Sequence, residues 1–471
     1  MTQILKRNPK LKWLAPVAVA LAARVFYLAY FNTDYVSASV YLNSMPAHNY
    51  INTGEFVFDG DHILHFFGGP ASEPWKKIKH RGVLLDPHEM PPEPYAHSPI
   101  ARPPGMSIML AALGKLTGSI RLALFRYFQI IIDALFCLLI GWFAGKVWSE
   151  KIGYIVSFAY ALYLPVVWLA AVPMEYVWLT WFGVGSAAVI IKGELDPYRF
   201  MAVTAIAGIG YWLRNELILF PYIFLALLLL FKAISFRRMM TCALAGLIPI
   251  IIMVFGYGLF FKAHTGNWYF SRNDKWHTLV QGRLAAQGMC DYDVYEANTQ
   301  MGGKRHPFFS QEYHDMARGI FFERFNKFSY WVNPKTAIKA LSWTIGKPNV
   351  WGPEILLPDP FKPLDMGHML MWKWDDWILF AFRGGRRVLM VAVFVLALFE
   401  MRRLYGKSRF SVLSIFIALF LFGFPAYLTQ HQGPAPYYFY SFRWCFYICA
   451  IAYALRFLRP SFFRAQKRAS A

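Results

Sequence analysis

Charged residues are scarce in this chain. Asp, Glu, Lys and Arg make up only 16% of its 471 residues, whereas 57% are hydrophobic and 18% are aromatic. Soluble domains carry about 25% charged residues, so this composition excludes a chain with a fully solvated surface. Apolar stretches of about 17–25 residues, long enough to cross a bilayer, recur along most of the sequence. The sequence therefore predicts an all-α polytopic membrane protein.

Cysteine is rare as well. Four of the five cysteines lie inside apolar runs, and only Cys290 lies in a loop. No CxxC pair and no Cys/His metal spacing occurs, so neither a disulfide framework nor a zinc ribbon is indicated. The two outer loops described below also lack any Asn-x-Ser/Thr site, which fits a bacterial inner membrane.

Acidic residues are outnumbered, 27 against 48 basic ones, which gives a net charge of +21. Most of the surplus Lys and Arg lies in short segments between apolar runs, where basic residues set membrane topology. We therefore expect no nucleic-acid partner. The basic segments, placed in the cytoplasm together with both termini, are Met1–Lys12, Lys146–Lys151, Lys192–Arg199, Lys232–Arg238, Met401–Arg409 and the tail from Arg456.

The positive-inside rule gives a consistent layout of about ten spans. The first apolar run is expected to be an uncleaved span, because it carries Arg24 and many further spans follow it. The predicted spans lie near 13–31, 121–144, 152–172, 176–192, 199–213, 217–233, 240–261, 386–400, 410–428 and 438–457. They divide the chain into an N-terminal catalytic module (1–261), an outer loop region (262–385) and a C-terminal part (386–471).

Two long connections fall outside, at 32–120 and 262–385. The first is rich in His and Pro and the second in Trp, a residue that favours the membrane interface. We expect both loops to form short amphipathic helices that cap a cleft. The apolar segment 106–116 is too short to span comfortably, so it is expected to be an interfacial or re-entrant helix. No internal repeat of the kind that marks inverted-repeat transporters is visible.

Asp34 follows the first span directly, at the predicted outer boundary. Low-dielectric surroundings raise the pKa of a carboxylate and suit it to accept a proton from a hydroxyl. The alternative is a polar residue at the end of a span that caps the next helix or contacts lipid headgroups.

Further charges fall on the same outer side. Glu175 lies in a tight turn between two apolar runs, where the helix dipole alone could explain it. Arg214, Asn215 and Glu216 interrupt two other runs, and arginine is the side chain best suited to hold a phosphate. Arg102 and Arg443 are additional outer cations, for which snorkelling is the structural alternative. Together these residues predict a lipid-phosphate site.

Two charges lie within spans instead. Arg24 belongs to the first span and Asp133 to the second. A charge in a span usually has a partner, so we expect a pair between them, or another polar contact inside the bundle, rather than catalysis. The histidines of the first loop, such as His62 and His88, could ligate a divalent metal, but their irregular spacing favours surface histidines.

The order of these features resembles the GT-C membrane glycosyltransferases, in particular the branch with the protein O-mannosyltransferases and the lipid A aminoarabinose transferase. The resemblance rests on the basic N-terminus, the arginine in the first span and Asp34 opening the first outer loop. It continues through Arg102-Pro103-Pro104 before a short apolar helix, Glu175 after a proline-ended span, the Leu213–Glu216 segment before Pro221, and Tyr440–Arg443.

This resemblance implies inverting transfer of a sugar from a polyprenyl-phosphate donor to a lipid, glycan or protein acceptor on the periplasmic side. It assigns Asp34 as catalytic base or acceptor anchor, with Tyr35 where members of the family commonly carry a second acidic residue. One carboxylate makes a poor cation site, so no metal or other cofactor is expected. On chemical grounds we place three arginines at the phosphate, namely Arg102, Arg214 and Arg443. Glu175 is expected to be a second catalytic group that orients the acceptor or an arginine. Tyr35 and Glu216 are placed near the acceptor.

Three other functions stay open at this stage. A transporter or flippase would bind its substrate near the bilayer midplane between broken helices. An oligosaccharide ligase or polymerase would use a diphosphate donor in the same outer cleft. A structural subunit would not need Asp34.

Overall fold

The computed structural model describes the chain as a helical protein with four two-residue strands. The strand pairs are antiparallel, β1 (Val57–Phe58) with β4 (Ser98–Pro99) and β2 (Lys79–His80) with β3 (Val83–Leu84). The residues that the structure describes are 11–30, 38–58, 79–80, 83–84, 98–99, 103–118, 120, 122–171, 175–191, 195–271, 276, 280, 311–324, 374–405 and 437–458.

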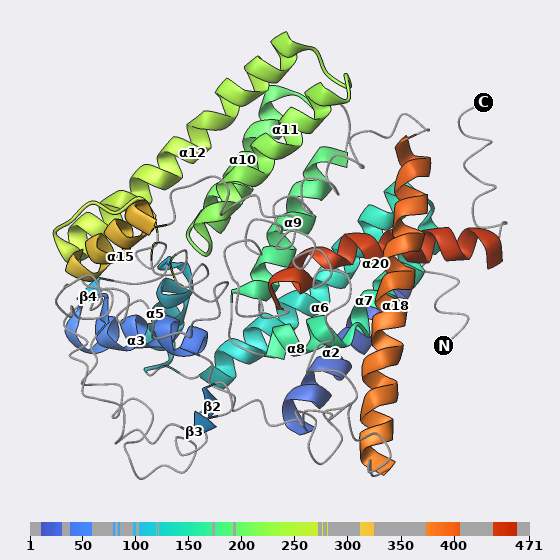
Figure 1. The fold of residues 1–471 in the computed structure, drawn as a ribbon, viewed down its shortest axis with the longest axis horizontal. Coiled ribbons are helices and arrows are strands. Elements are labelled where there is room, and N and C mark those ends of the chain that lie inside the picture. Colours follow the sequence, from blue (N-terminus) through green and yellow to red (C-terminus); the bar gives the residue numbers. More distant parts are fainter. Residues whose placement is uncertain are drawn as a thin grey trace.

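A bundle of N-terminal helices forms the centre of the molecule (Figure 1). Its members are η1 (Leu11–Trp13), α2 (Leu14–Tyr30), α6 (Leu122–Val147), α7 (Glu150–Ala161), α8 (Leu164–Ala171) and α9 (Tyr176–Ile191). The C-terminal helices α18 (Trp374–Tyr405) and α20 (Tyr437–Leu458) pack on each other, and α20 also packs on α7, α8 and α9. At this junction the rings of Phe143 and Trp444 meet edge to face, 5.9 Å apart, in the core.

The next helices form a second group beside α9. They are α10 (Pro197–Tyr211), η3 (Asn215–Leu219), α11 (Phe220–Leu230) and the long α12 (Phe236–Thr265), which packs along α10. The exposed side chains of α12 include Leu244, Ile248, Ile251, Ile252, Phe255 and Leu259. Their spacing puts them on one face, and an apolar face of this length is suited to lipid rather than to water.

Polar residues start the helices that follow the predicted cytoplasmic connections. Ser149 Oγ accepts from the backbone N–H of Ile152 at the start of α7, and Asp196 Oδ1 accepts from Arg199 N at the start of α10, at 3.4 and 2.8 Å. Ser235 caps α12 in the same way. These caps satisfy N–H groups that have no partner within the helix, so they fix where each helix begins.

Three shorter helices belong to the predicted outer loops: α3 (Ala38–Thr53), α5 (Gly105–Thr117) and α15 (Gln311–Arg324). Helix α3 packs against α5, and Gly114 of α5 leaves room for Ile51. The short helix expected after Pro104 is therefore present as α5. Helix α15 lies near the chain beyond the end of α12, where burial together with the carboxylates of Asp315 and Glu312 raises the pKa of Tyr269.

The predicted spans match the helices in most places. Eight of them coincide with a helix or, at 217–233, with η3 and α11, whereas 410–428 lies outside the described residues. The single span expected at 152–172 holds two helices, α7 and α8, separated by a short break, and its crossing of the membrane stays a prediction. Among the described helices, α6 and α12 are long and apolar enough to cross a membrane alone. Together with the composition, they indicate a membrane protein, while the number of ten spans stays a prediction.

Candidate functional site

Glu175 and Arg214, which the sequence placed on one side of the membrane, contact each other. Glu175 directly precedes α9, and Arg214 follows the end of α10 in an extended conformation. Glu175 Oε1 lies 3.6 Å from Arg214 Nη1, and the two residues are only 3% and 8% exposed. A buried charge needs a partner, so this ion pair joins the ends of two helices that run in opposite directions.

The turn that carries Arg214 is held by its own backbone. The N–H groups of Leu213 and Arg214 both donate to the carbonyl of Gly210, at 2.9 and 2.8 Å. Asn215 Nδ2 donates to the carbonyl of Tyr211, and the N–H of Leu217 donates to that of Arg214. Arg214 therefore closes the turn between α10 and η3, and Asn215 and Glu216 begin η3, so the backbone of Arg214 is fixed on both sides.

Helix α5 begins on this turn. The N–H of Gly105 donates to the carbonyl of Trp212 at 2.7 Å. A Cβ atom at Gly105 would lie 2.6 Å from that carbonyl oxygen and 2.9 Å from Leu213 Cδ2, so this close approach requires glycine. The glycine that follows the Arg-Pro-Pro motif is thus docked on Trp212 and Leu213, the two residues before Arg214.

Aromatic side chains surround the start of α9. Trp178 stacks on Phe125 of α6 with ring centroids 6.4 Å apart, and it lies 4.5 Å from Trp181. Trp178 and Phe182 pack against the core cluster that includes Tyr211 and Leu213. The Glu175–Arg214 pair therefore lies in a largely apolar environment, where its charges act more strongly than they would in water.

The other predicted site residues are not placed by the structure. Asp34, Tyr35 and Arg102 lie outside the described residues. The backbones of Glu216 and Arg443 belong to η3 and α20, while their side chains are outside the description. Of the seven predicted residues, the structure brings together only Glu175 and Arg214, and the roles of all seven stay predictions. Within the described ranges no group of three or more metal-ligating side chains converges.

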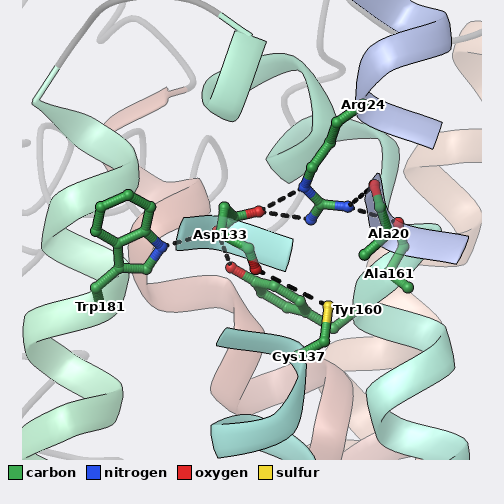
Figure 2. Close-up of polar contacts among 7 residues, drawn as sticks. All are labelled: Ala20, Arg24, Asp133, Cys137, Tyr160, Ala161 and Trp181. Atoms are coloured by element: carbon green, nitrogen blue, oxygen red, sulfur yellow. Dashed lines mark hydrogen bonds and ion pairs between the residues drawn. The ribbon is translucent and has the colours of Figure 1, made fainter. Parts of the chain in front are cut away.

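The pairing expected between Arg24 and Asp133 is confirmed (Figure 2). Both side chains are fully buried, and Arg24 Nε and Nη2 lie 2.7 and 2.6 Å from Asp133 Oδ2. Tyr160 and Trp181 donate to Asp133 Oδ1 at 2.7 and 2.8 Å. Arg24 Nη1 also donates to the carbonyl of Ala161 at 2.9 Å. This cluster connects α2, α6, α7 and α9.

Sequence reasoning missed the two uncharged members of this cluster. Nothing distinguishes Tyr160 and Trp181 among the 27 tyrosines and 17 tryptophans of the chain. The sequence does contain one signal for the end of α7, namely Pro165, which lies four residues after Ala161. Proline has no N–H, so the carbonyl of Ala161 cannot receive its usual helical hydrogen bond and α7 ends there. Arg24 supplies the donor instead.

Comparison with known proteins gives a distant structural likeness only. No family model matches the chain, and no curated protein matches it in sequence. It is similar to the apo oligosaccharyltransferase of Archaeoglobus fulgidus, with 12% identity, 98% of this chain and 52% of that chain covered, and a TM-score of 0.48. It is also similar to oligosaccharyltransferase AglB from the same organism in complex with an inhibitory peptide and a dolichol-phosphate, with 13% identity, 99% and 52% covered, and a TM-score of 0.49. The chain thus spans about half the length of these proteins, and likeness at this level assigns no family.

Proposed function

We propose that this protein is a membrane glycosyltransferase that moves a sugar from a polyprenyl-phosphate carrier to an acceptor hydroxyl on the outer face of a bacterial inner membrane. The observation that carries the proposal is the buried Glu175–Arg214 pair at the ends of α9 and α10, with the start of α5 docked beside it. Buried charge of this kind in an apolar chain marks a functional site by default. The sequence resemblance to GT-C enzymes supports the same reaction.

The reaction needs little from the protein beyond placement and charge. The acceptor oxygen attacks the anomeric carbon, the bond from that carbon to the phosphate oxygen breaks, and the hydroxyl proton passes to a base. Asp34 is the proposed base. Negative charge grows on the leaving phosphate, and Arg214, with Arg102 and Arg443, would neutralise it. Direct displacement at one carbon inverts its configuration.

Glu175 has a different task in this scheme. Its carboxylate lies beside the guanidinium of Arg214 and is held by the first turn of α9, where the N–H of Leu179 donates to the Glu175 carbonyl. It therefore orients Arg214 toward the phosphate before the donor binds. A group that is placed in advance needs no reorganisation during the reaction. Tyr35 and Glu216 are assigned to the acceptor side.

The test is release of free polyprenyl phosphate by the protein reconstituted in liposomes with a panel of polyprenyl-phosphate sugars and an acceptor mixture. Wild type should release the carrier from one donor, and Asp34→Asn or Arg214→Gln should lower the rate by about 10²–10³-fold. Arg199→Gln is the matched control, because Arg199 forms a half-exposed pair with Asp196 at the opposite end of α10. It should retain the wild-type rate.

Other products would identify other functions. Release of polyprenyl diphosphate would indicate an oligosaccharide ligase or polymerase. Movement of the lipid-linked sugar between leaflets without release would indicate a flippase. Full activity of both Asp34→Asn and Arg214→Gln would overturn the assigned roles.

A further inference from the structure

We propose that Asp133 is a positioning residue for Glu175, because its carboxylate holds the chain on both sides of the turn that carries Glu175. The effect on catalysis rests on the proposed function, whereas the effect on the position of the turn does not. Asp133 itself lies in the middle of α6 and is fully buried, so it is not expected to touch a substrate.

Two hydrogen bonds to one oxygen atom form the clamp (Figure 2). The hydroxyl of Tyr160, at the end of α7, and the indole N–H of Trp181, in the second turn of α9, both donate to Asp133 Oδ1. Helix α8 and the Glu175 turn lie between these two anchors in the chain. The segment from 161 to 180 is therefore fixed to α6 at both of its ends.

This segment needs such anchors because it starts with a break. Pro165 deprives the carbonyl of Ala161 of its helical donor, and α7 stops there. Arg24 Nη1 donates to that carbonyl, while its Nε and Nη2 contact Asp133 Oδ2. The second carboxylate oxygen thus holds the arginine that caps the break, so one side chain is linked to the hydrogen bonds at both ends of the segment.

The distance from anchor to site is short. Trp181 follows Glu175 by six residues, about 9 Å along a helix. A rotation of α9 that follows from loss of the Trp181 anchor would shift Glu175 relative to Arg214, which already lies at 3.6 Å. Misplacement of a catalytic group by 1 Å can lower a rate by about 10²-fold.

Stability alone does not call for this arrangement. Apolar residues of similar volume often stabilise a core as well as a buried ion pair does, whereas a hydrogen-bonded carboxylate admits one arrangement of its donors. The clamp therefore fits a requirement for a defined position. Trp178 stacks on Phe125 and also contacts Phe128 with tilted rings, which adds a second contact between α9 and α6 on the side toward Glu175.

The experiment uses Tyr160→Phe and Trp181→Phe, which each delete one hydrogen bond and leave the Arg24–Asp133 pair in place. Ser157→Ala is the matched control, since it deletes the 2.6 Å bond from Ser157 Oγ to the carbonyl of Cys137 between the same helices α7 and α6. The two clamp variants should lower kcat by about 10–100-fold with little change in KM. Ser157→Ala should leave both constants near wild type.

A double-mutant cycle with Glu175→Gln separates positioning from general support of the fold. If the clamp acts through Glu175, Tyr160→Phe and Trp181→Phe should change the residual rate of Glu175→Gln by less than about twofold. If the clamp variants lower the rate by the same factor in Glu175→Gln as in wild type, the proposal is overturned. Equal losses in the clamp variants and in Ser157→Ala would overturn it as well.

Hydrogen–deuterium exchange gives a readout that does not require activity. The clamp variants should exchange faster at 175–180 and 211–215 than wild type, and Ser157→Ala should not. If no donor is turned over but exchange responds in this way, the proposed function fails and the positioning role stands. If the donor is turned over and exchange at these segments is unchanged, the positioning role fails and the proposed function stands.

Discussion

In the part of the chain that the structure describes, two buried arginine–carboxylate pairs differ in the distance between their charged groups. Asp133 accepts from Arg24, Tyr160 and Trp181 at 2.6–2.8 Å, in the middle of the bundle. Glu175 and Arg214 are 3.6 Å apart, at helix ends and slightly exposed. Short charge-assisted hydrogen bonds are about 2.7–2.9 Å long, so the second pair is held less tightly than the first.

This difference indicates a division of labour. A carboxylate whose oxygens both receive short bonds from neighbouring helices sets the geometry of those helices. In the proposed function, the longer pair at the helix ends places its charges at the donor phosphate. The contrast predicts that changes in the first pair act mainly on the fold and its alignment, and that changes in the second act mainly on the reaction.

The largest effect is expected from breaking the central pair. Asp133→Leu leaves the buried guanidinium of Arg24 unpaired, which should lower the free energy of unfolding by about 3–5 kcal/mol. Thermal denaturation in detergent, followed by tryptophan fluorescence, measures this. Glu150→Gln, which removes the partner of Lys12 in a surface pair 39% and 67% exposed, is the control and should cost less than about 1 kcal/mol.

The double variant Arg24→Met with Asp133→Leu sharpens this test. It should recover only part of the lost stability, because an apolar pair replaces the buried ion pair but not its hydrogen bonds. The carbonyl of Ala161 would lose its donor, and Tyr160 and Trp181 would lose their acceptor, and each unmade bond should cost about 1–3 kcal/mol. Full loss of folding in the double variant would show that the hydrogen bonds, rather than the charges, sustain the bundle.

The second effect concerns the docking of α5 on the Arg214 turn. Gly105→Ala should destabilise the protein by about 1–3 kcal/mol, since its Cβ would lie 2.6 Å from the carbonyl oxygen of Trp212. It should also lower the transfer rate, because the turn must move. Gly185→Ala, in α9, is the matched control, with nothing within 4 Å of its Cβ, and should leave both quantities unchanged or slightly raise stability. Equal behaviour of the two variants would contradict the docking role.

The sequence was most informative where charge is rare. Arg24 and Asp133 were predicted to pair because a charge within a span needs a partner, and Glu175 and Arg214 were predicted on one side because basic connections fix topology. The length of the apolar runs located most of the helices. These inferences depend on local composition and on the cost of charge in lipid, which one sequence displays directly.

What the sequence did not reveal depends on packing between distant segments. Tyr160 and Trp181 act because α7 and α9 both lie against α6 at the depth of Asp133, and Gly105 matters because α5 starts on Trp212. Neither relation leaves a periodic signal. The break within 152–172 was a partial exception, since Pro165 removes the helical donor of the Ala161 carbonyl. A proline alone does not locate a helix end, however, because α12 continues through Pro249.

The third effect is loss of the Glu175 carboxylate. Glu175→Gln should cost about 1–2 kcal/mol of stability, less than Asp133→Leu, because the 3.6 Å pair is looser. The rate of sugar transfer should fall by at least about tenfold, since Arg214 loses the group that orients it. Parallel denaturation and turnover assays decide whether Glu175 mainly supports the fold or mainly orients Arg214. A stability loss as large as that of Asp133→Leu would make both pairs structural.

The smallest difference in stability is expected between two identical substitutions in different places. Trp148 Nε1 donates to Glu400 at 2.8 Å, and Trp181 Nε1 donates to Asp133 at the same distance. Either change to phenylalanine should cost about 1.5–3 kcal/mol, the usual net value of one hydrogen bond to a charged group, so the two variants should be about equally stable.

Their effects on turnover should nevertheless differ. Glu400 also holds Arg456 at 2.9 Å, near the ends of α18 and α20 and next to the basic residues Arg402 and Arg403, which the sequence predicts to be cytoplasmic. Trp148→Phe should therefore leave kcat unchanged, and Trp181→Phe should lower it. Since the two variants lose the same bond, equal kcat values would show that the Asp133 cluster supports the bundle without placing Glu175.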